Sequence, residues 1–115
     1  MILVSFDIDG TLETGDPPGP VSLEHVSEAK RRGHVIGSAS DRTLAEQRKM
    51  WEKAGIVVDF VSHKHHLTET KSSFVCTRLV HIGDTLVDEH YARLAGFEFW
   101  HVDSLPPPST PGWVF

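Results

Sequence analysis

The stretch Ile2-Leu3-Val4-Ser5-Phe6-Asp7-Ile8-Asp9-Gly10-Thr11 decides how this chain is interpreted. Its first five residues predict a β-strand, and two carboxylates follow at the strand's end. Side chains alternate along a strand with a period of two, so Asp7 and Asp9 should share one face. Two like charges held this close need a cation or a shared proton, unless the segment is only a solvated acidic turn. Gly10 and Thr11 allow a sharp turn there, at which a substrate could approach main-chain N–H groups.

The composition limits the kind of protein to which these carboxylates can belong. The chain has 115 residues, 39% of them hydrophobic and 23% charged, which predicts one globular domain. No apolar run approaches the roughly 20 residues that span a bilayer, and no basic leader precedes the first strand, so we expect a cytoplasmic protein. The net charge of −5 disfavours broad nucleic-acid binding, although a phosphorylated polynucleotide end remains possible as a substrate.

Strand and helix patterns alternate after the first strand. Strands are expected at 34–38, 56–62, 79–82 and 97–102, and helices at 22–32, 43–55, within 67–76 and from about 86 to 95. In the last helix, the spacing of Val87, Tyr91, Leu94 and Ala95 predicts the buried face. This alternation predicts an α/β, three-layer Rossmann-like fold with a five-stranded, mostly parallel sheet covered on both faces.

The C-terminal segment differs from the rest in composition. Residues 1–103 are expected to form the core, and residues 104–115 a proline-rich tail, because Pro106-Pro107-Pro108 and Pro111 oppose regular structure. The apolar ending, Trp113-Val114-Phe115, should pack back onto the core, with docking on a partner as the alternative.

Chemistry-bearing residues recur where the expected strands end. In parallel sheets, ligands bind at the carboxyl ends of the strands. The residues at these ends are Asp7 and Asp9, Ser40 and Asp41, His63 and Lys64, and Asp84. Carboxylates, a hydroxyl and a cation in one place suit phosphoryl chemistry with a divalent metal.

These motifs resemble those of the haloacid dehalogenase superfamily of phosphohydrolases, in its minimal form without a cap domain. The resemblance rests on Asp7-Ile8-Asp9-Gly10-Thr11, on Ser40, on a lysine after the third strand, and on Gly83-Asp84-Thr85-Leu86-Val87-Asp88 followed by Ala95-Gly96. It implies that Asp7 forms an aspartyl-phosphate and that Asp9 acts as general acid and base. The implied cofactor is Mg²⁺, held by Asp7, the Asp9 carbonyl and Asp84, with Asp88 behind them. The implied contacts to a phosphorylated substrate come from Gly10, Thr11, Ser40, Asp41 and the lysine.

Several assignments stay open. Lys64 directly follows the third strand and is favoured as the site lysine, while Lys71 is the alternative because its context resembles a helix start. Ser38 competes with Ser40 as the phosphate-binding hydroxyl. His63, His65 and His66 could border the site or form a plain solvated loop, because adjacent histidines should point in different directions and so disfavour a zinc site.

The function indicated is Mg²⁺-dependent hydrolysis of a phosphomonoester. The alternative is a non-catalytic module that binds metal and phosphate on the same fold. A response-regulator receiver is disfavoured, because its acceptor aspartate should follow the third strand, where this chain has Ser62-His63-Lys64. The sequence names neither the substrate nor the oligomeric state.

Overall fold

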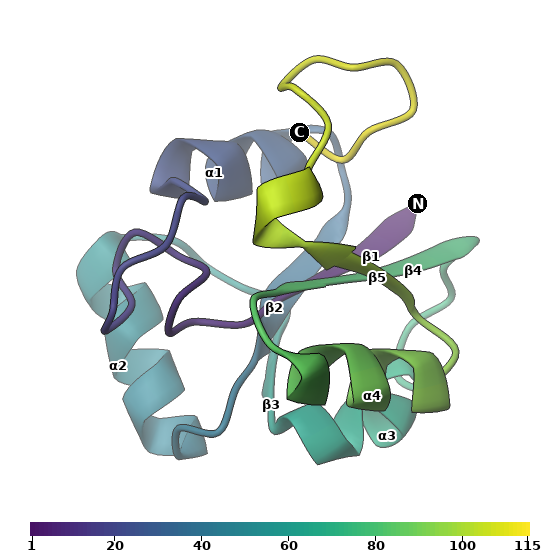
Figure 1. Ribbon diagram of the computed structural model, residues 1–115. Coiled ribbons are helices and arrows are strands. Elements are labelled where there is room, and N and C mark those ends of the chain that lie inside the picture. Colours follow the sequence, from purple (N-terminus) through teal and green to yellow (C-terminus); the bar gives the residue numbers. More distant parts are fainter.

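A single parallel sheet organises the chain, whose residues 1–115 are all described by a computed structural model (Figure 1). Its strands are β1 (Ile2–Phe6), β2 (Val35–Ala39), β3 (Phe60–Ser62), β4 (Arg78–Gly83) and β5 (Glu98–His101). Their order is β3-β2-β1-β4-β5, and every neighbouring pair is parallel. The predicted α/β, Rossmann-like fold is confirmed. The direction of strand addition reverses between β1 and β4, which is where such sheets place their ligands.

Helices cover both faces of this sheet. They are α1 (Leu23–Arg31), α2 (Leu44–Ala54), α3 (Leu67–Lys71) and α4 (Leu86–Leu94), with short 3₁₀ helices η1 (Lys64–His66) and η2 (Val102–Ser104). Val26 of α1 and Trp51 of α2 join one hydrophobic cluster with the β1 residue Phe6. Leu67 and Ala92, from α3 and α4, join a second cluster. The sheet is therefore the middle of three layers, and none of the helices is long and apolar enough to cross a membrane.

Local sequence signals account for most helix ends. The Ser22 side chain accepts a hydrogen bond from the His25 N–H, and the Thr43 side chain accepts one from the Glu46 N–H. Helix α2 then ends at Gly55, whose φ of 72° favours glycine. Thr43 and Glu46 form only half of a capping box, because the Glu46 carboxylate accepts a hydrogen bond from the Thr43 hydroxyl rather than from the Thr43 N–H.

Strand β3 is shorter than the predicted 56–62. Pairing with β2 begins only at Phe60, opposite Gly37. The residue before it, Asp59, bonds to Ile36 through its own carboxylate as well as its N–H, so a side chain replaces part of the ladder. The apolar run before Asp59 crosses over the end of α2 instead of extending the strand.

The predicted buried face of α4 is partly wrong. Val87 and Leu94 are 49% and 71% exposed, whereas Asp88, Ala92 and Ala95 are buried. The helix is rotated so that Asp88 points into the protein, where it finds hydrogen-bond partners. The buried face of α4 therefore includes the hydrogen-bonded Asp88 carboxylate and differs from the face that the spacing of apolar residues predicts.

The C-terminal residues complete the core. Trp113, Val114 and Phe115 are all buried, and the Trp113 ring packs edge-on against Trp100 at 5.0 Å between centroids. Arginine side chains hold the adjacent backbone, since Arg32 donates to the Trp113 carbonyl and Arg78 to the Gly112 carbonyl. The expectation that this ending packs on the domain is confirmed.

Candidate active site

Three carboxylates meet at the carboxyl edge of the sheet. Asp7 follows β1, Asp84 follows β4, and Asp88 lies in the first turn of α4. One oxygen from each of them lies within 4.8 Å of the others. The Asp7 backbone is fixed by donation from its N–H to the Ile82 carbonyl, and its Oδ1 accepts from the Ile8 N–H. The order of strands thus brings together residues that are far apart in the sequence.

Lys64 supplies the cation at this cluster. Its side chain is only 5% exposed, and its Nζ lies 3.2 Å from Asp7 Oδ2, 3.2 Å from Asp88 Oδ1 and 3.6 Å from Asp41 Oδ2. Lys71 lies elsewhere: its Nζ donates to the Ala95 carbonyl at 2.6 Å and ties α3 to the end of α4. The structure therefore places Lys64 beside Asp7, and gives Lys71 a structural contact.

Asp88 is held in a buried hydrogen-bond network. His81 Nε2 lies 2.9 Å from Asp88 Oδ1, and His81 Nδ1 lies 2.8 Å from the Ser5 hydroxyl. Asp88 Oδ2 accepts from the N–H and the hydroxyl of Thr85, which completes a capping box. Both oxygens are thus engaged, so Asp88 serves to position Lys64 and α4. Sequence analysis missed His81 and Ser5; the only signal was a polar residue inside each apolar strand.

Asp84 has the opposite environment. Its Oδ1 is buried and has no hydrogen-bond partner. Its carboxylate lies against Gly10, where φ is +73° and a Cβ would come within 1.9 Å of Asp84 Oδ2. Gly10 therefore has two separate reasons to be glycine, the left-handed backbone and the close approach of a carboxylate. An unpaired buried oxygen is costly and marks a position where a ligand would be bound favourably.

Asp9 lies apart from this cluster and pairs with Arg42. Arg42 Nη2 and Nε lie 2.5 and 3.2 Å from the Asp9 carboxylate oxygens, and the Asp16 N–H donates to Oδ1 at 2.9 Å. The hydrogen bonds from Arg42 hold the pKa of Asp9 below its ordinary value. Arg42 had no assigned role from sequence, although it directly follows Ser40 and Asp41.

The two candidate hydroxyls have different partners. Ser38 is tied into the core, where it donates to Gln47 Oε1 at 2.7 Å and accepts from Trp51 Nε1 at 2.9 Å. Ser40 Oγ accepts from the Arg42 N–H at 3.1 Å, which leaves its own proton free. Ser40 is therefore the hydroxyl that could donate to a phosphoryl oxygen.

The other residues expected to contact the substrate, Gly10, Thr11 and Asp41, differ in whether their polar groups are free. The N–H groups of Gly10 and Thr11 donate to the carbonyls of Pro17 and Ile8, so neither is free for a ligand. Thr11 Oγ1 is buried without a partner. The Asp41 side chain is 80% exposed and reaches the site only through Lys64. Of the N–H groups of Gly10 and Thr11 and the side chains of Thr11 and Asp41, only Thr11 Oγ1 has no hydrogen-bond or ionic partner.

Burial and charge set the protonation of the central pair. Burial, reinforced by the charge of Asp88 and opposed by Lys64, raises the pKa of Asp7 to about 8. Burial also acts to raise the pKa of Asp88, but the hydrogen bond from His81 and the charge of Lys64 outweigh it, so the pKa of Asp88 is lowered. Burial works against the charge on Lys64, yet Asp7 and Asp88 raise its pKa.

The residues present fit a divalent cation. Lys64 pairs with Asp7, Asp41 and Asp88, and Arg42 pairs with Asp9, whereas Asp84 has no cationic partner. The buried Asp84 oxygen lacks any partner, and carboxylate oxygens are the ligands that Mg²⁺ prefers. Asp7 and Asp84 are thus the side chains best placed to hold such an ion, with Asp88 already saturated.

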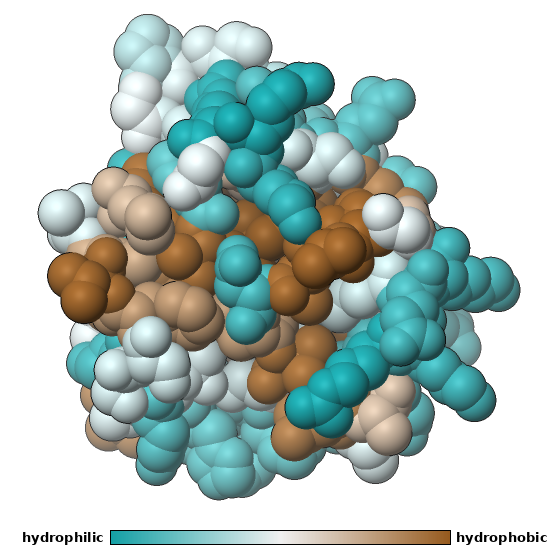
Figure 2. All heavy atoms as spheres, turned by 180° about the vertical axis from the view of Figure 1, so that it is seen from behind, coloured by the Kyte–Doolittle hydropathy of each residue, from teal (hydrophilic) through white to brown (hydrophobic).

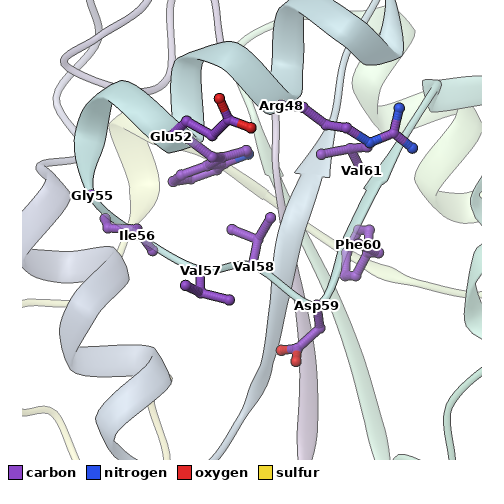
Figure 3. Close-up of a pocket in the computed structure, with 10 residues that line it drawn as sticks. Arg48, Glu52, Gly55, Ile56, Val57, Val58, Asp59, Phe60 and Val61 are labelled. Atoms are coloured by element: carbon purple, nitrogen blue, oxygen red, sulfur yellow. The ribbon is translucent and has the colours of Figure 1, made fainter.

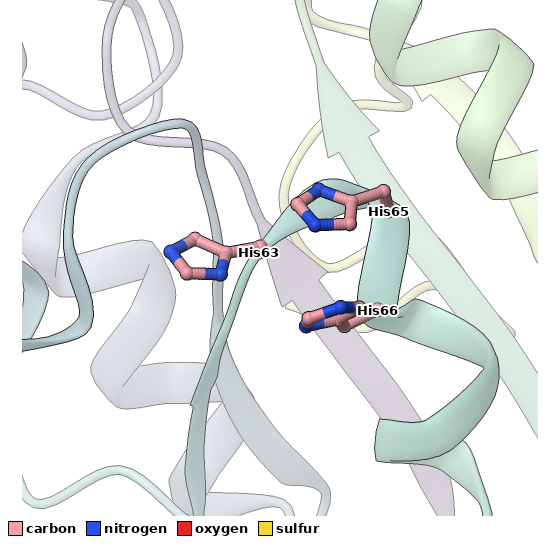
Figure 4. Close-up of side chains that lie close together, drawn as sticks. All are labelled: His63, His65 and His66. Atoms are coloured by element: carbon pink, nitrogen blue, oxygen red, sulfur yellow. The ribbon is translucent and has the colours of Figure 1, made fainter.

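Three histidines lie around Lys64, with His63 directly before η1 and His65 and His66 within it (Figure 4). The ring centroids of His65 and His66 are 4.1 Å apart, and those of His63 and His65 are 5.4 Å apart with nearly parallel planes. The expectation that adjacent histidines point in different directions is therefore wrong for this turn. The 3₁₀ geometry gathers the rings, because the His66 N–H closes the turn on the His63 carbonyl.

An apolar groove lies apart from these carboxylates. Between α2 and β3 it is lined by residues that include Trp51, Val58 and Phe60 (Figure 3), and no residue assigned to the site from sequence lines it. The view from behind shows apolar surface near the centre of that face, bordered by hydrophilic side chains (Figure 2). This groove is therefore separate from the candidate site residues.

Comparison with known proteins adds no relative. Neither a scan against protein-family models nor a search of the curated proteins found a match to this chain.

Proposed function

We propose that this protein is a Mg²⁺-dependent phosphatase that hydrolyses a phosphomonoester through an aspartyl-phosphate on Asp7. The observation that carries the proposal is the position of Lys64, buried within 3.2 Å of both Asp7 and Asp88. Asp84, which belongs to the same carboxylate cluster, has an oxygen without a partner. Phosphoryl transfer requires a nucleophilic carboxylate, a cation beside it, and a carboxylate oxygen that is free to bind a metal.

The first step in this proposal is attack on phosphorus. An Asp7 oxygen forms the new O–P bond while the bond from phosphorus to the leaving oxygen breaks. Lys64 neutralises charge on both the nucleophile and the phosphate, and the Ser40 hydroxyl, whose own proton is unused, donates a hydrogen bond to a phosphoryl oxygen. The leaving oxygen takes a proton from Asp9, and the alcohol departs.

The second step releases phosphate. A water molecule attacks the phosphorus of the aspartyl-phosphate, its proton passes to Asp9, and the O–P bond to Asp7 breaks. The pairing with Arg42 favours ionised Asp9, which suits this role as base. In the first step Asp9 has to donate a proton, so its carboxyl must then leave Arg42.

A bound Mg²⁺ would be held by Asp7 and Asp84, with the Asp9 carbonyl as a further oxygen ligand implied by the family resemblance. It would supply the positive charge that lets an anionic carboxylate approach an anionic phosphate. Such a charge also favours the ionised form of Asp7, whose pKa is otherwise raised to about 8 by burial.

The site is reached without a lid from this chain. Residues 7–22 between β1 and α1 contain no helix or strand apart from a Leu12–Val21 bridge, and only α2 separates β2 from β3. Neither connection holds a cap domain. This favours substrates whose phosphate lies on an accessible or bulky group.

Hydrolysis of p-nitrophenyl phosphate tests the proposal. Wild type should turn over with Mg²⁺ and stop with EDTA, and Asp7→Asn should lose at least about 1000-fold in rate, since loss of a nucleophile removes the covalent route. Lys71→Met is the control, because Lys71 contacts only the end of α4. Mg²⁺-dependent turnover that survives in Asp7→Asn would refute the proposed nucleophile. Metal binding without turnover of any phosphomonoester would favour the non-catalytic module.

A further inference from the structure

The cluster formed by His63, His65 and His66 has no role in the proposed phosphatase chemistry. His63 lies between β3 and η1, and His65 and His66 lie in η1. Lys64 lies between them in sequence, yet its side chain turns inward to the carboxylates. One short segment therefore presents a cation to one side and imidazole rings to the other.

The ring nitrogens of the three histidines lie close to one another. One nitrogen from each of His63, His65 and His66 lies within 4.8 Å of the others, and Figure 4 shows the rings gathered at one end of the turn. Nitrogens bound to a tetrahedral Zn²⁺ at 2.0–2.1 Å lie about 3.4 Å apart. The rings must therefore approach by no more than about 1.4 Å, which side-chain rotation of half-buried His63 and exposed His65 and His66 can supply.

The cluster also lacks the hydrogen bonds that hold other histidines. His25, His34, His81 and His101 each use a ring nitrogen in a hydrogen bond. The rings of His63, His65 and His66 take part in none of the side-chain hydrogen bonds of the structure, and they lie against one another and against Tyr91. Their nitrogens remain available as ligands.

The backbone beneath the cluster is firmly held. Leu67 is buried directly after it, the Thr70 hydroxyl donates to Ser62 Oγ at 2.9 Å, and the His66 N–H closes the turn. The three rings therefore project from a fixed turn rather than from a free loop. Pre-organised ligands lose less entropy when they bind an ion.

We propose that His63, His65 and His66 form a three-imidazole site for Zn²⁺, distinct from the carboxylate cluster. Imidazole nitrogen is a preferred ligand of Zn²⁺, whereas Mg²⁺ selects oxygen. Three protein ligands leave a fourth position open to water or an anionic group. Because the ligands flank Lys64, the bound ion fixes the turn that presents this lysine to Asp7.

The test is zinc binding by tag-free, chelator-stripped protein in millimolar Mg²⁺, measured against a chromophoric competitor. The wild type should bind one Zn²⁺ per chain, and Asp84→Asn should bind it equally, because the carboxylate cluster is not involved. His65→Ala and His66→Ala should each weaken binding at least 10-fold, a loss typical even of residues that merely support a ligand. His90→Ala is the control, since His90 is exposed and outside the cluster.

Co²⁺ provides a second readout that needs no turnover. Bound at the cluster, it should show visible absorption that is lost in His66→Ala and retained in Asp84→Asn. Absence of Zn²⁺ binding in the wild type would overturn the proposal. So would binding that His66→Ala leaves unchanged, or that His90→Ala weakens equally. These measurements do not involve phosphate hydrolysis, so the phosphatase proposal can fail or stand independently.

Discussion

The buried Asp7 carboxylate should destabilise the metal-free protein. We predict that Asp7→Asn is more stable than the wild type at pH 7 in EDTA. Burial raises the pKa of Asp7 from 3.8 to about 8, so between these values the native state keeps a proton that the unfolded chain has released. The free energy of unfolding therefore falls as pH rises through this window.

The size of the effect follows from the two pKa values. Each pH unit above 3.8 costs about 1.4 kcal/mol until the native carboxyl begins to ionise near pH 8. The loss reaches about 4 kcal/mol at pH 7 and stays below about 2 kcal/mol at pH 5. An asparagine does not titrate, so Asp7→Asn should recover up to these amounts. Loss of the Lys64 contact to Asp7 Oδ2 reduces the gain.

Urea unfolding at pH 5, 6 and 7 measures this directly, with reductant present because Cys76 is a free cysteine. Asp103→Asn is the matched control, since its side chain is 84% exposed, and it should change stability by less than about 0.5 kcal/mol. Added Mg²⁺ should narrow the gap between wild type and Asp7→Asn by binding the wild type better, by about 2.7 kcal/mol at 100 times its Kd.

Two results would refute this reasoning. Asp7→Asn could prove no more stable than the wild type at pH 7 in EDTA, or the difference could stay constant from pH 5 to pH 7. The first would mean that burial of Asp7 costs no more than its contact with Lys64 returns, and the second would mean that Asp7 is ionised at these pH values without a metal. If Asp7→Asn is more stable than the wild type and inactive, its loss of activity is not caused by misfolding.

Three other substitutions test neighbouring parts of the structure. Lys64→Met should cost about 3–5 kcal/mol in urea unfolding and abolish turnover, because it leaves buried carboxylates without a cation. Lys71→Met should cost only about 1–2 kcal/mol and leave turnover intact. Equal losses in the two variants would contradict the assignment of Lys64 to the site. Gly10→Ala should destabilise more than Gly33→Ala, since both have positive φ but only Gly10 has a carboxylate in the place of a Cβ; equal costs would show that the carboxylate moves freely. Trp113→Ala should cost about 3–5 kcal/mol in the same assay if the C-terminal residues belong to the core, and under about 1 kcal/mol if they do not.

The fold was predictable because local signals agree with the long-range ones. Strand β1 and the caps Ser22 and Gly55 appear within about a residue of where the sequence indicates. Spacing also predicted that Lys64, directly after β3, would reach the carboxylates better than Lys71. These inferences needed only chain length, turn residues and the parallel topology.

The remaining details depend on contacts between distant segments. Asp88 is hydrogen-bonded to His81 of β4, and α4 buries Asp88 while Val87 and Leu94, which its apolar spacing predicts to be buried, are exposed. Arg42 finds Asp9 across 33 residues. Neither pairing has a local signature, because hydrogen bonds between side chains on different elements follow from tertiary packing.

Protonation at this site is the reverse of what the proposed first step requires. In the metal-free structure, burial favours neutral Asp7 and Arg42 favours ionised Asp9, whereas attack needs ionised Asp7 and protonated Asp9. A divalent cation beside Asp7 lowers its pKa. A substrate phosphate is an alternative bidentate partner for Arg42, and its arrival would release Asp9 and let its pKa rise. Under the proposed function, metal and substrate together therefore establish the catalytic protonation state, and the free protein stays inactive until both are bound.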